Sequence, residues 1–538
     1  MNLAQIFTPY ELAYQMVEMT FNEIKQDSYR ILEPSCGEGA FVQALLDYAD
    51  KNNINITILA VDIDPTVLTK CPQDQRVEYL CANTLLHDFG QEKFDIVIGN
   101  PPYVQMQSFG RQTTGDKPRK TEQQLLDEKS AKAQLAHQGY STYSSMGDLY
   151  QIFYELGYNI LKQRGIMAYI TSNKWMRAGY GASTRELFSQ KMNPLLLLDL
   201  GANVFESATV DSNIIVLSKS NNQGITKAAT VSKKDLRSTK LATINFNYSQ
   251  GWFIGSQAEI ALKQKIERLG KPLKDWDVKI NYGIKTGLNE AFIIDQETRD
   301  MLVAKDPRSQ EIIKPILRGK DIKRYGYQWA GLYVIGTFPS LKLNIDDYPA
   351  VKEYLISFGK ERLEQSGNTL SDGTKSRKKT GNKWFETQDQ IAYFEEFEKE
   401  KIVYSEIVRE PQFYLDKSGT YYAEATTFLL TGDGAKFLCG VFNSTGFTYF
   451  FKNYYAGGGL GEMGYRYKKA FLDNVPIPPL DTHERKEIAC EIESLVDQIL
   501  ELKAKDADAD IAHLENKIDE LVFELYELSE EEIGLINA

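Results

Sequence analysis

The spacing of apolar positions divides the chain into three parts, of which the first covers residues 1–245. Helical periodicity over residues 10–25 is followed by short apolar runs that helix-like segments or loops separate. The runs that predict strands are residues 30–32, 56–62, 77–80, 94–99, 165–171, 195–200 and 213–217. Because strands that alternate with helical patterns form mainly parallel sheets, the first part is predicted to be an α/β domain with helices on both faces.

The remaining chain changes character twice. Over residues 246–480 aromatic residues become frequent and turns interrupt short strand-like runs, which predicts a separate α+β domain. Over residues 481–538 apolar residues recur every three or four positions on either side of a polar break at 503–510. This spacing is typical of amphipathic helices, so we expect a C-terminal helical hairpin.

A polar insert interrupts the first part. Residues 104–146 are rich in Gln, Lys, Ser and Thr and show no clear strand pattern. Long inserts of this kind are usually mobile surface loops or functional lids. We therefore expect residues 104–146 to be either a mobile surface loop or a functional segment, which would act as a lid or contact DNA.

Charge changes the picture more than composition does. The net charge of −12 alone argues against a nucleic-acid partner. Of the 74 acidic and 62 basic residues, however, 18 and 5 lie in residues 481–538, which leaves 56 and 57 for residues 1–480. The acidity therefore belongs to the tail, and the nearly neutral body can hold local basic patches.

The most basic window of the body is residues 371–385. Its cationic residues are Lys375, Arg377, Lys378, Lys379 and Lys383. Side chains of this type can follow the phosphates of a nucleic acid, and we predict that role for them. The alternative is a solvated flexible loop.

Several classes of protein are not indicated. The five cysteines are scattered without a Cys-x-x-Cys pair, and only four histidines are present, so we expect neither a metal site nor disulfides. No apolar run approaches the roughly 18 residues that span a membrane, and the first residues lack the pattern of a signal peptide. We therefore expect a cytoplasmic protein with no membrane partner.

Candidate cofactor residues follow the first two predicted strands. Glu33-Pro34-Ser35-Cys36-Gly37-Glu38-Gly39 leads into a predicted helix, and its two glycines allow a ligand to approach the backbone closely. Asp62 ends the next strand, where a carboxylate can bind both hydroxyls of a ribose. The glycine fingerprint for a pyrophosphate is missing, which favours a nucleoside cofactor without one. The alternative is a tight turn and an unrelated surface acid.

The most specific motif is Asn100-Pro101-Pro102-Tyr103, at the end of another apolar strand. Prolines fix the turn and lack backbone donors, but their carbonyls remain acceptors. The Asn100 side-chain oxygen and the Pro101 carbonyl can accept hydrogens from an exocyclic amino group, and Tyr103 offers a face for a planar base. The alternative is a proline-rich strand exit with a buried tyrosine.

In this order, the motifs of residues 1–245 resemble the gamma-class DNA methyltransferases that modify adenine N6, typified by the TaqI methyltransferase. The resemblance implies a Rossmann-like domain that binds S-adenosyl-L-methionine, with a mixed, mainly parallel sheet. It implies that Thr8, Glu33, Gly37, Gly39, Asp62, Ile63, Asn83, Pro102 and Phe153 bind the cofactor. It also implies that Asn100, Pro101, Tyr103 and Phe205 hold a flipped adenine. Asn83 departs from the acid usual at its position.

Residues 246–480 resemble the target-recognition domains of the same class more weakly. The elements that carry this resemblance include Ile280–Gly287 and Ile316–Ile322. The resemblance implies double-stranded DNA as partner and base flipping, and it leaves open a separate restriction endonuclease. We expect a monomer. The alternatives are a methyltransferase for RNA or for a protein glutamine, a DNA-binding subunit without catalysis, and a bifunctional restriction enzyme. The last is disfavoured because the cofactor motif begins almost at Met1 and the tail has no clear nuclease core.

Overall fold

A computed structural model describes residues 7–113, 120–201, 211–231, 236–247, 251–456 and 464–537. The chain divides into two compact units, Met1–Ile260 and Ala261–Ala538. The second unit includes both the segment expected to recognise DNA and the acidic C-terminal segment. No helix among the described residues is long and apolar enough to cross a membrane.

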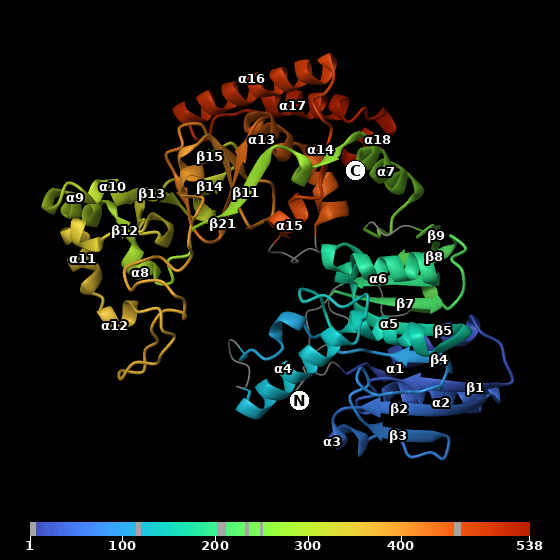
Figure 1. The fold of residues 1–538 in the computed structure, drawn as a ribbon. Coiled ribbons are helices and arrows are strands. Elements are labelled where there is room, and N and C mark those ends of the chain that lie inside the picture. Colours follow the sequence, from blue (N-terminus) through green and yellow to red (C-terminus); the bar gives the residue numbers. More distant parts are fainter. Residues whose placement is uncertain are drawn as a thin grey trace. The chain divides into compact units, whose positions relative to one another are not determined.

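A single mixed sheet forms the centre of the first unit (Figure 1). Its described strands follow the order β3-β2-β1-β4-β5-β7-β6-β8-β9. Their bounds are β1 Ser28–Glu33, β2 Asn55–Asp62, β3 Val77–Cys81, β4 Phe94–Gly99, β5 Leu161–Ser172, β6 Asn193–Gly201, β7 Ser212–Ser218, β8 Thr226–Thr230 and β9 Ala242–Ile244. The strands from β3 to β5 pair in parallel, whereas β7 runs antiparallel to β5 and β6. The predicted mixed, mainly parallel sheet is confirmed.

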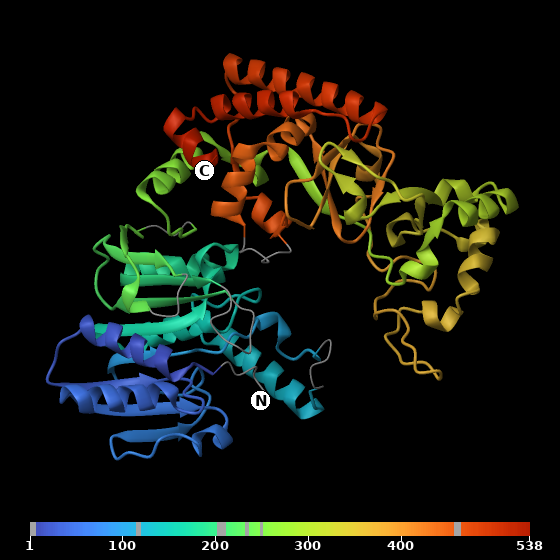
Figure 2. The ribbon, with the colours of Figure 1, turned by 180° about the vertical axis from the view of Figure 1, so that it is seen from behind.

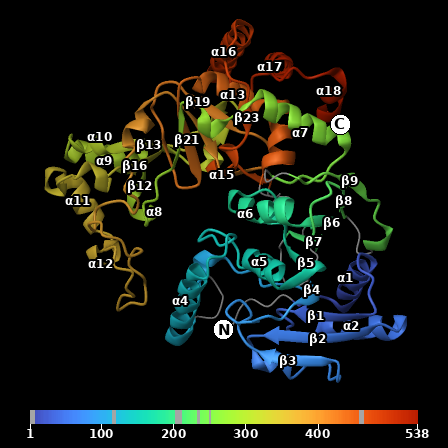
Figure 3. The same cartoon turned by 45° about the vertical axis from the view of Figure 1, so that its right-hand side comes forward.

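Helices cover both faces of the sheet, and successive residues of a strand point to opposite faces and so enter different cores. On β1, Ile31 joins one apolar core, with helices α1 (Tyr10–Asn22) and α2 (Ala40–Asn52). The next residue, Leu32, joins the other core, with helix α5 (Tyr150–Ile160). Figure 3 shows the strands between these two layers. Because β2, β1 and β4 are parallel, their carboxyl ends lie at the same edge of the sheet.

The insert after β4 contains a helix that the polar sequence did not predict. Helix α4 covers Glu122–His137 and begins with a reciprocal capping box between Thr121 and Gln124. Only Glu128, Ala131 and Leu135 of this helix are buried. The short helices of this unit are α3 Pro65–Leu68 and α6 Ala182–Glu186.

The second unit is an α+β assembly built on two four-stranded sheets, β11-β21-β17-β19 and β12-β16-β13-β20. The strands are β11 Val278–Tyr282, β12 Ile293–Asp295, β13 Ile313–Leu317, β16 Leu332–Ile335, β17 Lys401–Ser405, β19 Phe413–Asp416, β20 Tyr422–Ala423 and β21 Thr427–Gly432. Helix α7, Gln257–Leu269, spans the boundary between the units. The next helices are α8 Asn289–Phe292, α9 Gln296–Lys305, α10 Ser309–Ile312, α11 Pro349–Ile356, α12 Lys360–Leu363, α13 Ala435–Asn443, α14 Thr445–Phe450 and α15 Lys469–Leu472.

The predicted C-terminal hairpin is present. Helices α16 (His483–Lys505) and α17 (Ala512–Leu525) lie side by side in Figures 1 and 2. Ile492 of α16 and Ile518 of α17 are fully buried. Ile492 contacts α13 at Gly440, where an added Cβ would lie 2.4 Å from the isoleucine side chain. A further short helix, α18 (Glu530–Asn537), follows.

Candidate active site

Three neighbouring strands deliver the candidate site residues to one edge of the sheet. Glu33 ends β1, Asp62 ends β2, and Asn100 follows β4 directly. Because β1 lies between β2 and β4, these three positions are adjacent in space although they are far apart in the sequence. Two neighbouring cavities open here and share Phe7, Ser35, Gly37 and Asn100 in their walls. The cavities therefore form one elongated cleft along the strand ends.

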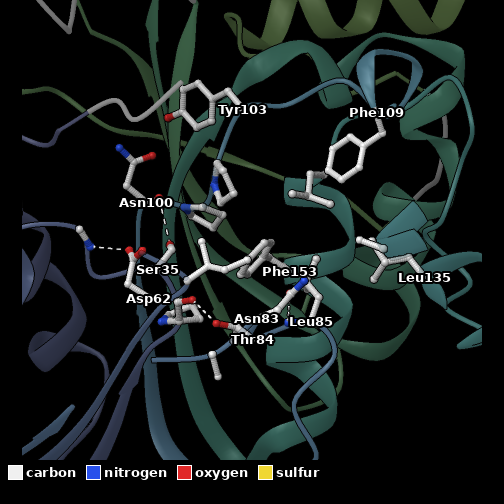
Figure 4. Close-up of a pocket in the computed structure, with 18 of the residues that line it drawn as sticks. Ser35, Asp62, Asn83, Thr84, Leu85, Asn100, Tyr103, Phe109, Leu135 and Phe153 are labelled. Atoms are coloured by element: carbon white, nitrogen blue, oxygen red, sulfur yellow. Dashed lines mark hydrogen bonds between the residues drawn. The ribbon is translucent and has the colours of Figure 1, made fainter. Parts of the chain in front are cut away.

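Asp62 organises the loop after β1. Its carboxylate accepts hydrogen bonds from the backbone N–H of Gly37 at 2.9 Å and of Asp64 at 2.9 Å. Gly37 and Gly39 have φ values of +52° and +84°, which L side chains rarely adopt. At Gly39 an added Cβ would also lie 2.7 Å from Pro72 Cδ. The glycines thus permit a backbone path that brings the loop against Asp62, at the wall of the cleft shown in Figure 4.

Glu33 is a buried carboxyl on the wall of the same cleft, only 1% exposed. The backbone N–H of Val42, in the first turn of α2, donates to it, and burial raises its pKa well above the usual value. Among the described residues its Oε2 has no hydrogen-bond partner. An isolated buried carboxylate of this kind is costly unless a cation compensates it, so the position suits the ammonium group of an amino-acid ligand.

Asn100 is fixed from two sides. Its Nδ2 donates to Thr8 Oγ1 at 3.0 Å, and its backbone carbonyl accepts from Ser35 Oγ at 3.2 Å. Nδ2 therefore points to the N-terminal segment, and the side-chain oxygen is the acceptor end of the amide. Ser35 thus engages the Asn100 carbonyl, and Pro101, the next residue, lines the same cavity as Asn100.

Tyr103 lies where the loop meets the protein interior. Its ring packs edge-on against Tyr150 at 6.2 Å between centroids, and its hydroxyl is hydrogen-bonded to Ser212, while burial raises its pKa. The ring also lines the cleft (Figure 4). Phe205, the second aromatic predicted to contact a base, lies outside the described residues.

The far end of the cleft is apolar and contains the other predicted cofactor residues. Ile63, Asn83, Pro102 and Phe153 line one cavity together with Asp62. Asn83 Oδ1 accepts a hydrogen bond from Leu85 N at 3.2 Å, so the amide is oriented by its own turn. A planar, weakly polar group such as a nucleobase fits these walls.

Several lining residues were not predicted from the sequence. Ser35 positions Asn100, and Phe7 lines both cavities. Leu85 and Leu149 complete the apolar end. The strand-end position of Ser35 was a usable signal, whereas apolar residues such as Leu149 have no sequence feature that separates them from core positions.

The basic window of the second unit is divided between surface and interior. Lys375, Lys378, Lys379 and Lys383 are exposed, in line with a phosphate-contacting surface. Arg377 differs from this expectation because its guanidinium is buried. It donates to the backbone carbonyls of Thr286, Leu363, Trp384 and Glu386, and burial lowers its pKa to about 10. Arg377 therefore ties its own loop to the rest of the unit.

This difference gives a stability prediction. Arg377→Ala removes the donor of the buried carbonyls of Thr286 and Leu363 and of the partly buried carbonyl of Trp384, whereas Gln365 still donates to Glu386 O; it is expected to lower the free energy of unfolding by about 3 kcal/mol or more. Lys378→Ala, on the adjacent exposed position, is the matched control and is expected to change it by less than about 0.5 kcal/mol. Denaturant unfolding monitored by tryptophan fluorescence measures both. Equal stability of the two variants would contradict a structural role for Arg377.

Comparison with known proteins identifies relatives of both units. Residues 38–205 match the Eco57I restriction-modification methylase family, and residues 314–477 match the TaqI-like C-terminal specificity domain. The Type II methyltransferase M.BstVI of Geobacillus stearothermophilus is 23% identical over 478 residues, which are 82% of this chain and 75% of that protein. M.PaeR7I of Pseudomonas aeruginosa is 24% identical over 322 residues, which are 56% of this chain and 50% of that protein.

The fold comparison extends over almost the whole chain. The structure of the Type IIL restriction-modification enzyme MmeI in complex with DNA matches with a TM-score of 0.61 at 14% sequence identity. The match covers 98% of this chain and 74% of the other. At this identity the likeness shows the fold, in which a mixed α/β unit is followed by a second unit.

Proposed function

We propose that this chain, a DNA methyltransferase of the restriction-modification kind with a methylase segment at residues 38–205 and a TaqI-like specificity domain at residues 314–477, methylates the N6 amino group of adenine. The observation that carries the proposal is the Asn100–Tyr103 loop, which shares one cavity with Asp62 and Gly37. An amino-group site and a nucleoside site therefore adjoin in a single cleft.

The residues of the cleft fit S-adenosyl-L-methionine from end to end. The buried Glu33 carboxyl suits the ammonium group of the methionine part. Asp62 is in position to accept from ribose hydroxyls, and the apolar cavity with Ile63 and Phe153 suits the adenine. When bound, the cofactor supplies an electrophilic methyl group on a sulfonium.

The chain's own contribution to transfer is orientation. The Asn100 side-chain oxygen and the Pro101 carbonyl accept the two hydrogens of the target amino group, which draws its nitrogen lone pair out of conjugation with the ring. Hydrogen bonds of this kind strengthen as the nitrogen becomes positive, so they favour the transition state over the ground state. The loop needs no side chain that forms a covalent bond with the substrate.

The target base must leave the duplex to reach this loop, which costs a few kcal/mol. We infer that stacking on Tyr103 and Phe205 offsets part of this, at roughly 1–3 kcal/mol per stacked base. The Tyr103 hydroxyl is held by Ser212, so the ring has a fixed plane before a base arrives.

The substrate and product are tested together by sequencing modified bases in genomic DNA from cells that express the protein. We expect N6-methyladenine at a single sequence motif with the wild-type chain and a much smaller methylated fraction with Asn100→Ala. Methylated cytosine in place of N6-methyladenine, or genomic DNA without a modified base, would refute the adenine assignment. The same experiment gives the recognition sequence.

We further propose that the exposed lysines of residues 371–385 contact DNA phosphates. Conversion of Lys375, Lys378 and Lys379 to glutamine is expected to make the negative slope of log K against log salt shallower by about 2 to 3, because each phosphate contact contributes about 0.9 to its magnitude. The matched control converts Lys486, Lys505 and Lys517, exposed residues of the acidic hairpin, and should leave the slope unchanged. An unchanged slope in the first variant would mean that these lysines do not contact DNA and belong to a solvated loop.

We propose that the chain acts as a monomer on double-stranded DNA. A separate restriction endonuclease that reads the same sequence is compatible with this function and needs no contact with this chain.

A further inference from the structure

The insert between β4 and α5 is anchored at its root, immediately after the Asn100–Tyr103 loop. Leu149 N donates to Val104 O at 2.8 Å, and Met106 N donates to Gly147 O at 2.9 Å. Gln105 and Asp148 form an antiparallel bridge at the same place. The two ends of the insert are thus joined, and its described residues form a segment that leaves the wall of the cleft and returns to it at the same place.

The buried side chains of the insert face the apolar end of the cleft. Phe109, Ala131 and Leu135 line the same cavity as Ile63, Asn83 and Phe153. Phe109 and Leu135 are 7% and 1% exposed and belong to the core that covers this face of the sheet. Figure 4 shows both side chains directed toward the cavity.

A buried carboxylate holds helix α4 against the turn that carries Phe109. Glu128, 5% exposed, accepts from Gly110 N at 2.9 Å and from Lys120 Nζ at 2.7 Å. Lys132 Nζ adds a bond to Met106 O at 2.6 Å. The polar contacts of α4 therefore set the place of the helix, and two of its three buried residues, Ala131 and Leu135, line the cavity.

We propose that the insert is part of the cofactor site: Phe109, Ala131 and Leu135 bind the adenine of S-adenosyl-L-methionine, and Glu128 is a positioning residue that seats them. The inference rests on the function proposed above. Because Ala131 and Leu135 of α4 would contact the adenine, cofactor binding and the ordering of α4 favour each other by the same factor.

The test measures cofactor affinity rather than activity alone. Leu135→Ala is expected to raise the dissociation constant for S-adenosylhomocysteine about tenfold and the KM for S-adenosyl-L-methionine similarly. The kcat at saturating cofactor and the KM for DNA should stay within about twofold. Leu135→Met, which conserves side-chain volume, should restore the affinity. Leu126→Ala on the same helix, at a residue 58% exposed, is the matched control and should have no effect.

Glu128 is tested in the same way. Glu128→Ala is expected to raise the dissociation constant for S-adenosylhomocysteine severalfold, and Glu128→Gln, which keeps an acceptor for Gly110 N, should recover part of it. Hydrogen exchange of residues 121–138 in the wild-type protein should slow when S-adenosylhomocysteine binds.

The outcomes separate this inference from the proposed function. If the wild type binds S-adenosylhomocysteine but Leu135→Ala binds it equally well and exchange does not slow, the insert is not part of the cofactor site. A raised KM for DNA at unchanged cofactor affinity would likewise overturn the inference in favour of a DNA contact. Failure of the wild type to bind any cofactor would refute the proposed function itself. If Leu135→Ala does not fold, Glu128→Gln and the wild-type exchange data decide.

Discussion

Replacement of Asn100 by alanine is expected to lower kcat for methyl transfer about 10²–10³-fold, the usual effect of removing one group that stabilises developing charge. The dissociation constant for S-adenosylhomocysteine should change by less than about twofold. The reason is that the side-chain oxygen acts on the target amino group, whereas the walls that surround the nucleoside remain. Single-turnover transfer of a labelled methyl group measures kcat, and calorimetry measures the binding.

Thr8→Val is the companion variant for this prediction. It removes the acceptor that holds Asn100 Nδ2 while preserving side-chain shape, so the amide keeps its chemistry and loses its orientation. We expect a loss in kcat of about tenfold, smaller than for Asn100→Ala, because a single hydrogen bond is worth about 0.5–1.5 kcal/mol. Full activity of Asn100→Ala would remove this residue from the mechanism.

Replacement of Asp62 by alanine is expected to weaken cofactor binding at least about 100-fold. The variant loses the acceptor for ribose hydroxyls, and it also releases the Gly37 N–H that the carboxylate holds. Two hydrogen bonds to a charged group, at roughly 1.5–3 kcal/mol each, account for a loss of this size. Calorimetric titration with S-adenosylhomocysteine is the direct measurement.

The control for Asp62 is Asp64→Ala. Asp64 caps the short helix α3 through Thr66 N and does not line the cleft, yet its backbone N–H still bonds to Asp62. Its substitution should change cofactor affinity less than about threefold. Equal losses in both variants would mean that the turn, rather than the Asp62 carboxylate, determines binding.

Residue patterns predicted the fold of the first unit well because they act locally. The central strands β4 and β7 are apolar runs because both faces of the sheet are covered there and all of their residues are buried, whereas the edge strand β3 has no fully buried residue. The places of Glu33, Asp62 and Asn100 followed from the rule that ligands bind at the carboxyl ends of such strands. The grouping of these residues was therefore predictable, although their hydrogen bonds were not.

Features that depend on tertiary contacts were not predictable. Helix α4 is polar on most of its surface because it buries only three side chains, so its pattern resembles that of a loop. Its one local signal, Thr121 followed by Gln124, is a capping box that marks a helix start. Arg377 sits in a run of cations that suggests solvent, but its partners lie as far away as Thr286 and Leu363. No spacing rule links such positions.

The place of β1 between β2 and β4 has a consequence for how the protein folds. β1 pairs with β2 through a local crossover, but its pairing with β4 joins Ile31 to Ile96 and requires closure of a long loop. The cleft is complete only after this non-local pairing, which contact-order arguments place among the slow steps. A chain that ends before β4 holds Asp62 and Gly37 but lacks Asn100 and also the cavity residues Pro102 and Phe153, so both the nucleoside end and the target-base end of the cleft form only after this pairing.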